Sequence, residues 1–260
     1  LKSKCENSLR KLVELDQWLT IGRWARSVEA IMPEICEHGI SIKSGRHLLI
    51  DGIADPVDYG LGNCADNGDQ QSIALLTGAN SGGKTTMLEL LAHCTILAHM
   101  GLPVPAKSAK VGRIESLHVL AKAGGTQSAG ALEQTLLQLA EVVSNSNSKL
   151  ILADELEAIT EPGAGARIIA GMLEAAESHS GTCMLLVTHL APAIIEAAGK
   201  EMRTDGIEAR GLDENLELIV DRTPRRNHLA RSTPELIVRR LVERSNGDAK
   251  DVFTSILGRF

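Results

Sequence analysis

The residues of this chain most suited to chemistry form a short glycine-rich loop with the sequence GANSGGKT. The loop fits the pattern G-x-x-x-x-G-K-[S/T], in which glycines let the backbone curl so that its N–H groups point at anionic oxygens. The pattern predicts that Lys84 contacts the β- and γ-phosphates of a nucleotide and that the hydroxyl of Thr85 ligates Mg²⁺. The residues expected to contact the nucleotide are Gly78, Ala79, Asn80, Ser81, Gly82, Gly83, Lys84, Thr85 and Thr86.

Two acidic residues and one histidine are the other candidates for chemistry. Asp154 and Glu155 follow the apolar run LILA, and His189 follows the run MLLVT. At the end of a strand, Asp154 would hold Mg²⁺ through water and Glu155 would polarise an attacking water, since phosphoryl transfer depends on positioning and charge neutralisation. His189 would sense the γ-phosphate, and its plainer interpretation is a polar residue that ends a strand. The predicted catalytic residues are Lys84, Glu155 and His189, and the predicted metal ligands are Thr85 and Asp154.

Strands and helices alternate along the middle of the chain, where they can position these side chains. Four apolar runs predict strands, and four segments with apolar residues at helical spacing predict helices. This alternation implies an α/β fold with a doubly wound, mainly parallel sheet that helices cover on both faces. The expected strands are 72–78, 113–121, 148–154 and 182–189, and the expected helices are 84–100, 128–144, 163–179 and 190–199.

The flanking regions have different patterns. They predict a long helix, short strands and turns, a hairpin and two further helices, at residues 6–31, 40–62, 207–223, 233–244 and 248–258. The hairpin turn is expected near Asp213. We divide the chain accordingly into a helical stem (1–39), a nucleotide-binding domain (40–225) and a helical tail that supports dimerisation (226–260).

The composition limits the classes of protein that the chain can represent. Its 260 residues are 43% hydrophobic and carry a net charge of -6, so a nucleic-acid contact should be local or supplied by another part. Five cysteines without paired spacing argue against a zinc site and a disulfide framework, and they favour a reducing cytoplasm. No apolar run approaches the roughly 20 residues that span a membrane. Because the first residue is Leu1 and a helical pattern starts at once, we expect a fragment of a longer protein.

Several motifs, in order, resemble the MutS family of DNA mismatch-repair and recombination ATPases. The stretch TGANSGGKTT is similar to the family's TGPNMGGKST loop, and GLPVPAKSAKVG is similar to its G-F-V-P-A-x-x-A-x-I-G stretch. The segment DELEAITEPGAGA resembles the family's DE-x-G-x-G-T, in a form closer to the second bacterial subfamily or to archaeal relatives. The stretch LVELDQWLTIGRWA resembles the helix that leads from the lever into the ATPase, and GRHLLI resembles the RHP strand. The resemblance covers about residues 7–200.

This resemblance implies an ATPase domain of the ABC type that binds ATP and Mg²⁺ in the cytoplasm. It also implies a head-to-tail homodimer in which the signature serine of one subunit completes the other's site. Ser128 is the candidate for this trans residue, because Ser128 and Glu133 keep the signature spacing although the residues between them differ. Ser128 can equally cap the N-terminus of a helix. Contact with DNA would come from regions mostly outside this chain.

Two parts of the chain depart from the family pattern. The family places an aromatic residue against adenine after the RHP strand, and Tyr59 is the nearest ring here. Past residue 225 the family's Ser-Tyr-Gly pattern is replaced by a basic segment, which would contact nucleic acid or a partner, or form a solvated loop. The arginines concerned are Arg222, Arg225, Arg226 and Arg231.

Other functions stay open at this stage. A MutS-like ATPase can act on branched DNA or ribosomes instead of in mismatch repair or recombination control. A nucleotide-dependent dimerisation module with little turnover is a second alternative, although Lys84, Asp154 and Glu155 are all present. A transporter-type ATPase should carry a Leu-Ser-Gly-Gly-Gln signature, which SAGALEQ does not match.

Overall fold

The computed structural model describes most of the chain. The described residues are 2–50, 52, 54–64, 71–79, 82–120, 129–156, 161–230 and 233–260, with the backbone alone at 129–132 and 135. Asn80, Ser81, Ser128 and Arg231 lie outside them.

A five-stranded parallel sheet forms the centre of the molecule. Its order is β6-β7-β8-β4-β9, with bounds Ser116–Leu120, Lys149–Asp154, Thr182–Val187, Ile73–Gly78 and Thr204–Ile207. The strands β4 and β8 are buried at every position, which explains why they are continuous apolar runs. The predicted α/β fold with a mainly parallel sheet is confirmed for this part of the chain.

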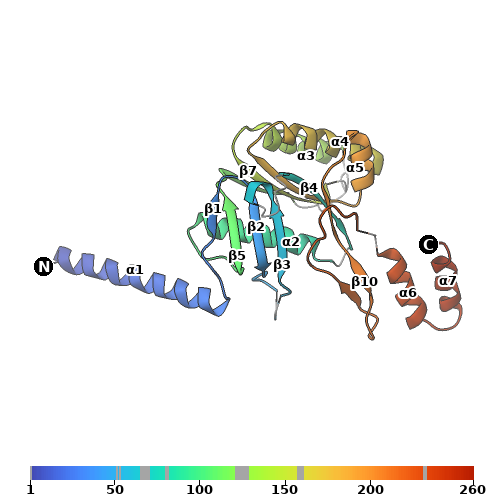
Figure 1. The fold of residues 1–260 in the computed structure, drawn as a ribbon, viewed down its shortest axis with the longest axis horizontal. Coiled ribbons are helices and arrows are strands. Elements are labelled where there is room, and N and C mark those ends of the chain that lie inside the picture. The colour runs from blue at the N-terminus through green and yellow to red at the C-terminus, as the bar shows by residue number, and fades with distance from the viewer. Residues whose placement is uncertain are drawn as a thin grey trace.

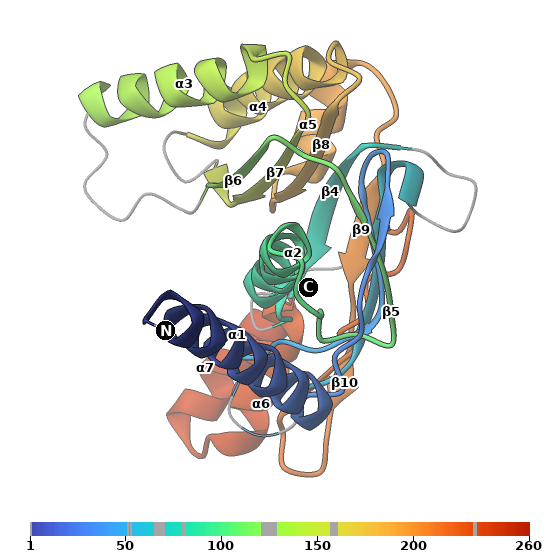
Figure 2. The ribbon, with the colours of Figure 1, turned by 90° about the vertical axis from the view of Figure 1, so that its left-hand side faces the viewer.

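Helices cover both faces of the parallel sheet, as Figure 2 shows. One face packs against α3, α4 and α5, with bounds Ala129–Ser144, Pro162–Glu177 and Ala191–Ala198. The other face packs against α2 (Lys84–His99), whose buried side chains include Leu88 and Leu91. The apolar core is therefore divided by the sheet into two layers.

A second, largely antiparallel sheet lies beyond α2 and was not predicted as a separate unit. Its order is β1-β5-β2-β3, with bounds Glu34–Cys36, Ser108–Gly112, Ile40–Gly45 and Val57–Leu61. β2 is antiparallel to both β3 and β5, whereas β1 is parallel to β5. Because α2 is buried between the two sheets, the second sheet completes the core that the parallel sheet begins.

The helix α1 (Lys2–Ser27) extends away from the sheets (Figure 1). Ala25 is its buried residue, and large apolar side chains such as Leu12 and Trp18 are exposed. β1 lies within the range that we assigned to the stem, yet it pairs with β5. Within the predicted stem, α1 therefore extends away from the sheets, whereas β1 belongs to the second sheet.

The C-terminal region follows the predicted pattern. β10 (Ala209–Leu212) and β11 (Leu218–Val220) form an antiparallel hairpin whose turn includes Asp213. The helices α6 (Pro234–Arg244) and α7 (Asp248–Leu257) pack against each other at the far end of the molecule from α1 (Figure 1). Neither helix contains a fully buried residue.

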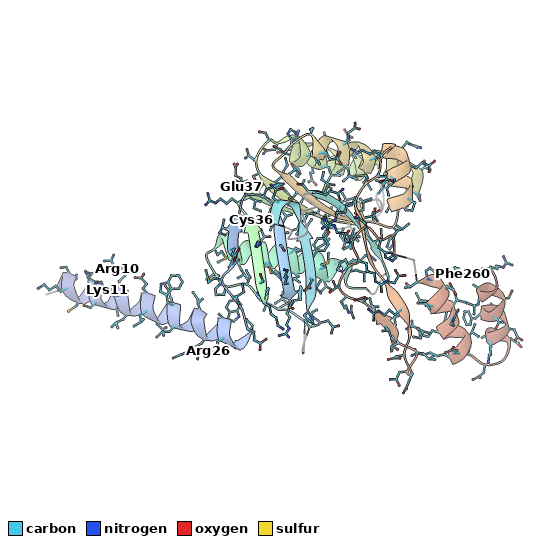
Figure 3. All side chains as sticks on the ribbon, viewed as in Figure 1. Arg10, Lys11, Arg26, Cys36, Glu37 and Phe260 are labelled. Carbon is cyan, nitrogen blue, oxygen red and sulfur yellow. A yellow bond between two sulfur atoms is a disulfide. The ribbon has the colours of Figure 1, made fainter. Side chains whose placement is uncertain are left out.

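The expectation that the cysteines form no disulfide is wrong for one pair. Cys36 at the end of β1 and Cys64 in the short 3₁₀ helix Gly62–Cys64 are joined by a disulfide, with their Cα atoms 6.1 Å apart. Figure 3 marks Cys36 on β1. Sequence spacing gives no sign of this pair, because the fold brings together residues separated by 28 positions.

The structure also bears on membrane insertion. None of the helices in the described ranges is both long enough and apolar enough to cross a bilayer.

Candidate nucleotide-binding site

The phosphate loop joins the end of β4 to the start of α2. Gly78 has a φ of +129°, and a Cβ atom there would lie 2.2 Å from the carbonyl oxygen of Ile207, so the close approach of β9 requires glycine. Gly83 precedes the helix with a φ of +86°. The backbone therefore turns sharply at both ends of the loop, and the N-terminus of α2 points its N–H groups toward it.

The side chain of Lys84 lies within the phosphate loop. Its side chain is buried, and Nζ donates hydrogen bonds to the carbonyl oxygens of Gly78 at 2.8 Å and Ala79 at 2.9 Å. These contacts fix the ammonium group at the mouth of the loop, where phosphate oxygens would compete for the same donor.

Thr85 and Asp154, the two predicted metal ligands, lie together at the C-terminal edge of the sheet. The hydroxyl of Thr85 donates to Oδ2 of Asp154 at 2.6 Å. One hydroxyl and one carboxylate oxygen fit Mg²⁺, which keeps several waters and takes further oxygens from substrate phosphates. Among the described residues there is no group of three His, Cys, Asp or Glu that could hold a metal ion by itself.

Glu155 and His189 also lie together. Nε2 of His189 is 2.8 Å from Oε1 of Glu155. Glu155 has a φ of +46°, and its N–H donates to the carbonyl oxygen of Val187 at 3.0 Å, which locks the turn after β7 against β8. This left-handed conformation in a non-glycine residue stores strain of the kind found at functional sites. The paired side chains are only partly exposed, with His189 at 40% and Glu155 at 24%.

A cavity of about 260 Å³ opens beside the loop at Gly83. Its apolar lining comes from Ile50 and Ala54 before β3, from Val57 of β3, and from Met87 and Leu90 of α2. A Cβ at Gly83 would lie 3.2 Å from a guanidinium nitrogen of Arg222, which also pairs with Asp55 at 3.4 Å. The lining residues are His47, Ile50, Ala54, Asp55, Val57, Gly82, Gly83, Thr86, Met87, Leu90 and Arg222.

The sequence predicts only Gly82, Gly83 and Thr86 among the residues that line this cavity. Two polar lining residues that it does not predict are His47, in the stretch GRHLLI, and Arg222, in the basic segment. The position of His47 in GRHLLI, the stretch that resembles the family's RHP strand, could have marked it as a site residue. The position of Arg222 depends on the return of the chain after β11, which no local pattern reveals.

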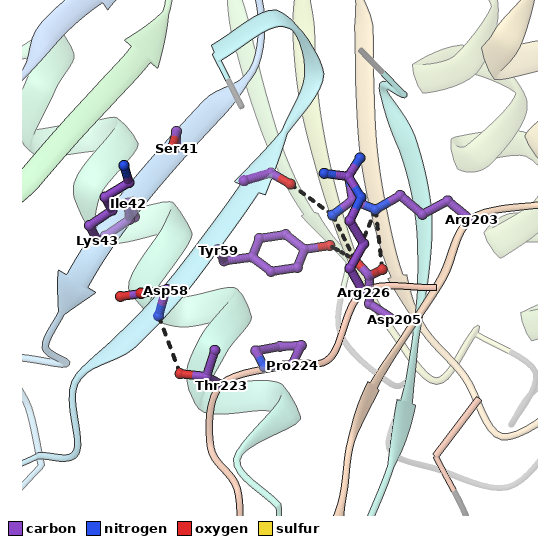
Figure 4. A pocket seen from close by; sticks show the side chains of 11 residues that line it. Ser41, Ile42, Lys43, Asp58, Tyr59, Arg203, Asp205, Thr223, Pro224 and Arg226 are labelled. Carbon is purple, nitrogen blue, oxygen red and sulfur yellow. Dashed lines mark hydrogen bonds and ion pairs between the residues drawn. The ribbon is translucent and has the colours of Figure 1, made fainter. Parts of the chain in front are cut away.

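The structure does not place Tyr59 in the cavity beside Gly83. The ring is 7% exposed, and its hydroxyl donates to Oδ2 of Asp205 at 3.0 Å (Figure 4). Burial, and then the charge of Asp205, raise the pKa of Tyr59 well above its ordinary value. The guanidinium of Arg203 lies 5.4 Å from the ring centroid and forms an ion pair with Asp205. The predicted stacking of Tyr59 on adenine therefore disagrees with its position in a separate polar cluster.

Arg222, Arg225 and Arg226, the arginines of the basic segment that the structure describes, have different surroundings. Arg225 lies 3.8 Å from Asp221, and Arg226 lines the cavity around Tyr59. Arg222 faces the phosphate loop. Their different positions therefore do not favour a single contact with nucleic acid that the three residues share.

A phosphate loop at the edge of a helix-covered parallel sheet, with Asp and Glu at the end of a neighbouring strand, defines a P-loop nucleotide-binding domain. Residues 74–223 match the family model described as MutS domain V. The chain is 42% identical, over 99% of its length, to the DNA-binding protein MutS2 of Pyrococcus furiosus. It therefore belongs to the MutS family and contains that family's C-terminal ATPase domain.

Two other relatives extend the comparison. The chain is 30% identical over 83% of its length to the endonuclease MutS2 of Clostridium beijerinckii, and 27% identical over 79% to the DNA mismatch repair protein MutS of Acetivibrio thermocellus. The matched regions are 45% of the Pyrococcus protein, 27% of the Clostridium protein and 24% of the Acetivibrio protein. The chain thus spans less than half the length of each of these relatives.

Proposed function

We propose that this chain is the ATP-binding and ATP-hydrolysing motor of a MutS-like DNA-binding protein. The observation that carries the proposal is the convergence of two side-chain pairs at the phosphate loop. Thr85 lies 2.6 Å from Asp154, and Glu155 lies 2.8 Å from His189. Both pairs stand at the same edge of the sheet as Lys84.

Each residue has a role in phosphoryl transfer to water. Lys84 binds the terminal phosphates, and Thr85 and Asp154 would hold Mg²⁺, which when bound neutralises phosphate charge. Glu155 aligns the attacking water and draws its proton, and His189 orients Glu155 and contacts the γ-phosphate. The backbone of residues 78–86 cradles the phosphates, and the cavity beside Gly83 receives the base.

The complete site is proposed to form in a head-to-tail homodimer. Ser128, which stands just before α3, would contact the γ-phosphate bound by the partner subunit. The spacing of Ser128 and Glu133, which is that of the family's signature helix, supports this arrangement. The helical tail, residues 226–260, is proposed to support the dimer.

The substrate of the whole protein is proposed from its relatives. The names of three of them specify DNA binding, an endonuclease and mismatch repair. We propose that the present chain drives DNA-directed work, in mismatch repair or recombination control, with DNA held by regions outside this sequence. A place in the cytoplasm is proposed from this DNA-directed role alone, because the Cys36–Cys64 disulfide removes the support that unpaired cysteines would give. Action on branched DNA or ribosomes, and a dimerisation module with little turnover, are the alternatives.

The test of the composite site uses mixed dimers. Ser128→Arg should leave ATP binding intact but block turnover, and Lys84→Ala should block ATP binding. When the two variants are mixed, one site carries both defects and the other neither, so part of the activity should return. No recovery, with mixed dimers demonstrated by mass measurement, would place Ser128 in its own subunit's site and contradict the proposal.

A further inference from the structure

A further cavity, of about 230 Å³, lies apart from the nucleotide site. Its lining comes from β2 and β3 of the second sheet, from the start of β9 and from the segment after β11. Figure 4 shows it from close by, with the ring of Tyr59 directed toward Asp205. The charged lining residues are the cations Lys43, Arg203 and Arg226 and the carboxylates Asp58 and Asp205. The wall therefore contains more cationic than acidic side chains.

Asp205 holds one of these cations in a fixed position. Nη2 of Arg203 lies 2.7 Å from Oδ2 of Asp205, and Nε donates to the same carboxylate at 3.0 and 3.2 Å. The side chains of this pair are 2% and 1% exposed. Nη2 of Arg203 also donates to the carbonyl oxygen of Gly60 at 2.8 Å, which ties the arginine to β3. Because desolvation offsets much of the attraction within a buried ion pair, stability alone does not account for this arrangement.

The two carboxylates of the wall also accept from other groups of the protein. The hydroxyl of Tyr59 donates to Asp205 at 3.0 Å, and the N–H of Asn227 donates to it at 3.2 Å. Together with the arginine, these donors fill the acceptor sites of the Asp205 carboxylate. Asp58 accepts from the N–H of Ser44 at 2.6 Å. The excess of cations among the lining residues therefore favours an anionic ligand in this cavity.

The backbone around Arg226 is fixed on both sides. Arg225 and Gly206 exchange two backbone hydrogen bonds, at 2.8 and 2.9 Å, and the N–H of Asn227 donates to Asp205. These bonds attach the chain before and after Arg226 to β9. The arginine is therefore held beside the cavity in advance, which lowers the entropic cost of binding a ligand there.

The charges of both arginines act at the same end of the cavity. Burial, and then the charge of Asp205, raise the pKa of Tyr59, whereas the charges of Arg203 and Arg226 lower it. Both guanidinium groups are therefore near the hydroxyl of Tyr59, which itself lines the cavity.

We propose that this cavity is a second anion site, which binds a phosphate group with Arg226 as the main contact and the fixed charge of Arg203 behind it. A guanidinium group stays charged and matches the oxygens of phosphate in bidentate geometry. The hydroxyls of Ser41 and Thr223 line the same cavity and can donate to further oxygens. The phosphate belongs either to free inorganic phosphate or to the backbone of a nucleic acid. The site is distinct from the cavity beside Gly83, with which it shares none of its lining residues.

The first experiment is a calorimetric titration of the full chain with inorganic phosphate. ADP and Mg²⁺ are present to occupy the phosphate loop, and potassium chloride at equal ionic strength is the blank. We expect a Kd on the order of 1 mM for the parent protein. Arg226→Met, which keeps an unbranched side chain without the charge, should weaken binding about tenfold or more. Arg225→Met is the matched control and should bind like the parent, because Arg225 lies 3.8 Å from Asp221 and is not among the lining residues.

A second titration, with a short single-stranded DNA, distinguishes the two sources of the phosphate. If the group belongs to a nucleic acid, Arg226→Met should weaken the DNA complex and reduce its salt dependence by about one unit of the log–log slope. Arg225→Met should leave both unchanged. If DNA affinity is equal in the two variants while phosphate affinity differs, the ligand is free phosphate.

Two further variants keep the test decisive. Lys84→Ala, titrated with phosphate without nucleotide, should bind it like the parent, so the result does not depend on the proposed ATPase site. Loss of binding in Lys84→Ala would instead place the anion at the phosphate loop and overturn the proposal. Lys43→Met, at an exposed position of the same cavity, should have a smaller defect and replaces Arg226→Met if that variant does not fold.

Three other results would also overturn the proposal. The first is a parent protein that binds neither probe. The second is equal binding of both probes by Arg226→Met and the parent. The third is an equal loss in Arg226→Met and Arg225→Met, which would reflect the general positive charge of the segment.

Discussion

Lys84 is the residue through which this chain should recognise the terminal phosphates. Its ammonium group lies buried in the loop, with the carbonyl oxygens of Gly78 and Ala79 as acceptors. In the bound state, phosphate oxygens would replace or join these acceptors. Loss of one partner of a buried, hydrogen-bonded charge pair costs about 2–5 kcal/mol.

We therefore predict that Lys84→Ala weakens ATP binding by about a hundredfold or more. Lys107→Ala, at an exposed lysine, is the matched control and should bind like the parent protein. Titration with a fluorescent ATP analogue measures both. Equal affinity in Lys84→Ala and the control would show that the loop is not the phosphate site.

The residues of the site differ in how far sequence could predict them. The phosphate loop is contiguous, so its pattern alone predicts a phosphate contact for Lys84 and a metal contact for Thr85. Asp154 and His189 could be predicted because the carboxyl ends of parallel strands meet at one edge of a sheet. Tyr59 could not be placed, because the face that it occupies depends on the register of β3 with β2, which shifts between Ile42 and Gly45.

At the scale of elements, the two sheets also differ in how far the sequence could predict them. The strands β4, β7 and β8 are apolar runs joined through helices, a pattern that specifies a parallel sheet. β1 has three residues, and β2 and β3 each include exposed or partly exposed positions, so their pattern does not reveal a second sheet or its order. The disulfide between Cys36 and Cys64 depends on that order and could not be predicted either.

The disulfide ties β1, the first strand after α1, to the chain just after β3. We predict that its reduction lowers the free energy of unfolding by about 3–4 kcal/mol, because it closes a loop between residues 28 positions apart in the unfolded chain. Urea unfolding with and without a dithiol reductant measures the difference.

The control for this prediction is the double variant Cys36→Ser, Cys64→Ser. It should unfold at the lower urea concentration in both conditions, since it has no bond to reduce. An unfolding midpoint of the parent protein that does not move on reduction would contradict a stabilising role of the disulfide.

At the scale of the whole molecule, partly buried histidines couple stability to pH. Burial lowers the pKa of His38, His93 and His118 below the ordinary value of 6.5, and the charges of His47 and Lys149 add to the effect at His93 and His118 respectively. The unfolded chain therefore binds protons more tightly at these positions. Their contribution to stability is fully present above pH 6.5 and is lost as the pH falls from there through the lowered values.

We expect a lower thermal unfolding midpoint at pH 5.5 than at pH 7.5, at constant ionic strength. The variant His93→Gln, His118→Gln should have a smaller difference between the two midpoints, because fewer groups take up protons on unfolding. A parent protein whose midpoint rises on acidification would have the opposite proton linkage and would contradict the assigned direction of these pKa shifts.

The central claim at this scale is that the assembled edge of the sheet hydrolyses ATP. Glu155→Gln tests it most directly, because glutamine keeps the shape of the side chain but cannot draw a proton from water. Steady-state phosphate release and ATP binding should be measured together, with Glu174→Gln at an exposed position of α4 as the control. We predict unchanged ATP affinity and turnover reduced about a hundredfold or more in Glu155→Gln, with the control equal to the parent. Turnover within a few-fold of the parent would remove Glu155 from the mechanism, and a parent without Mg²⁺-dependent ATP hydrolysis would contradict the account.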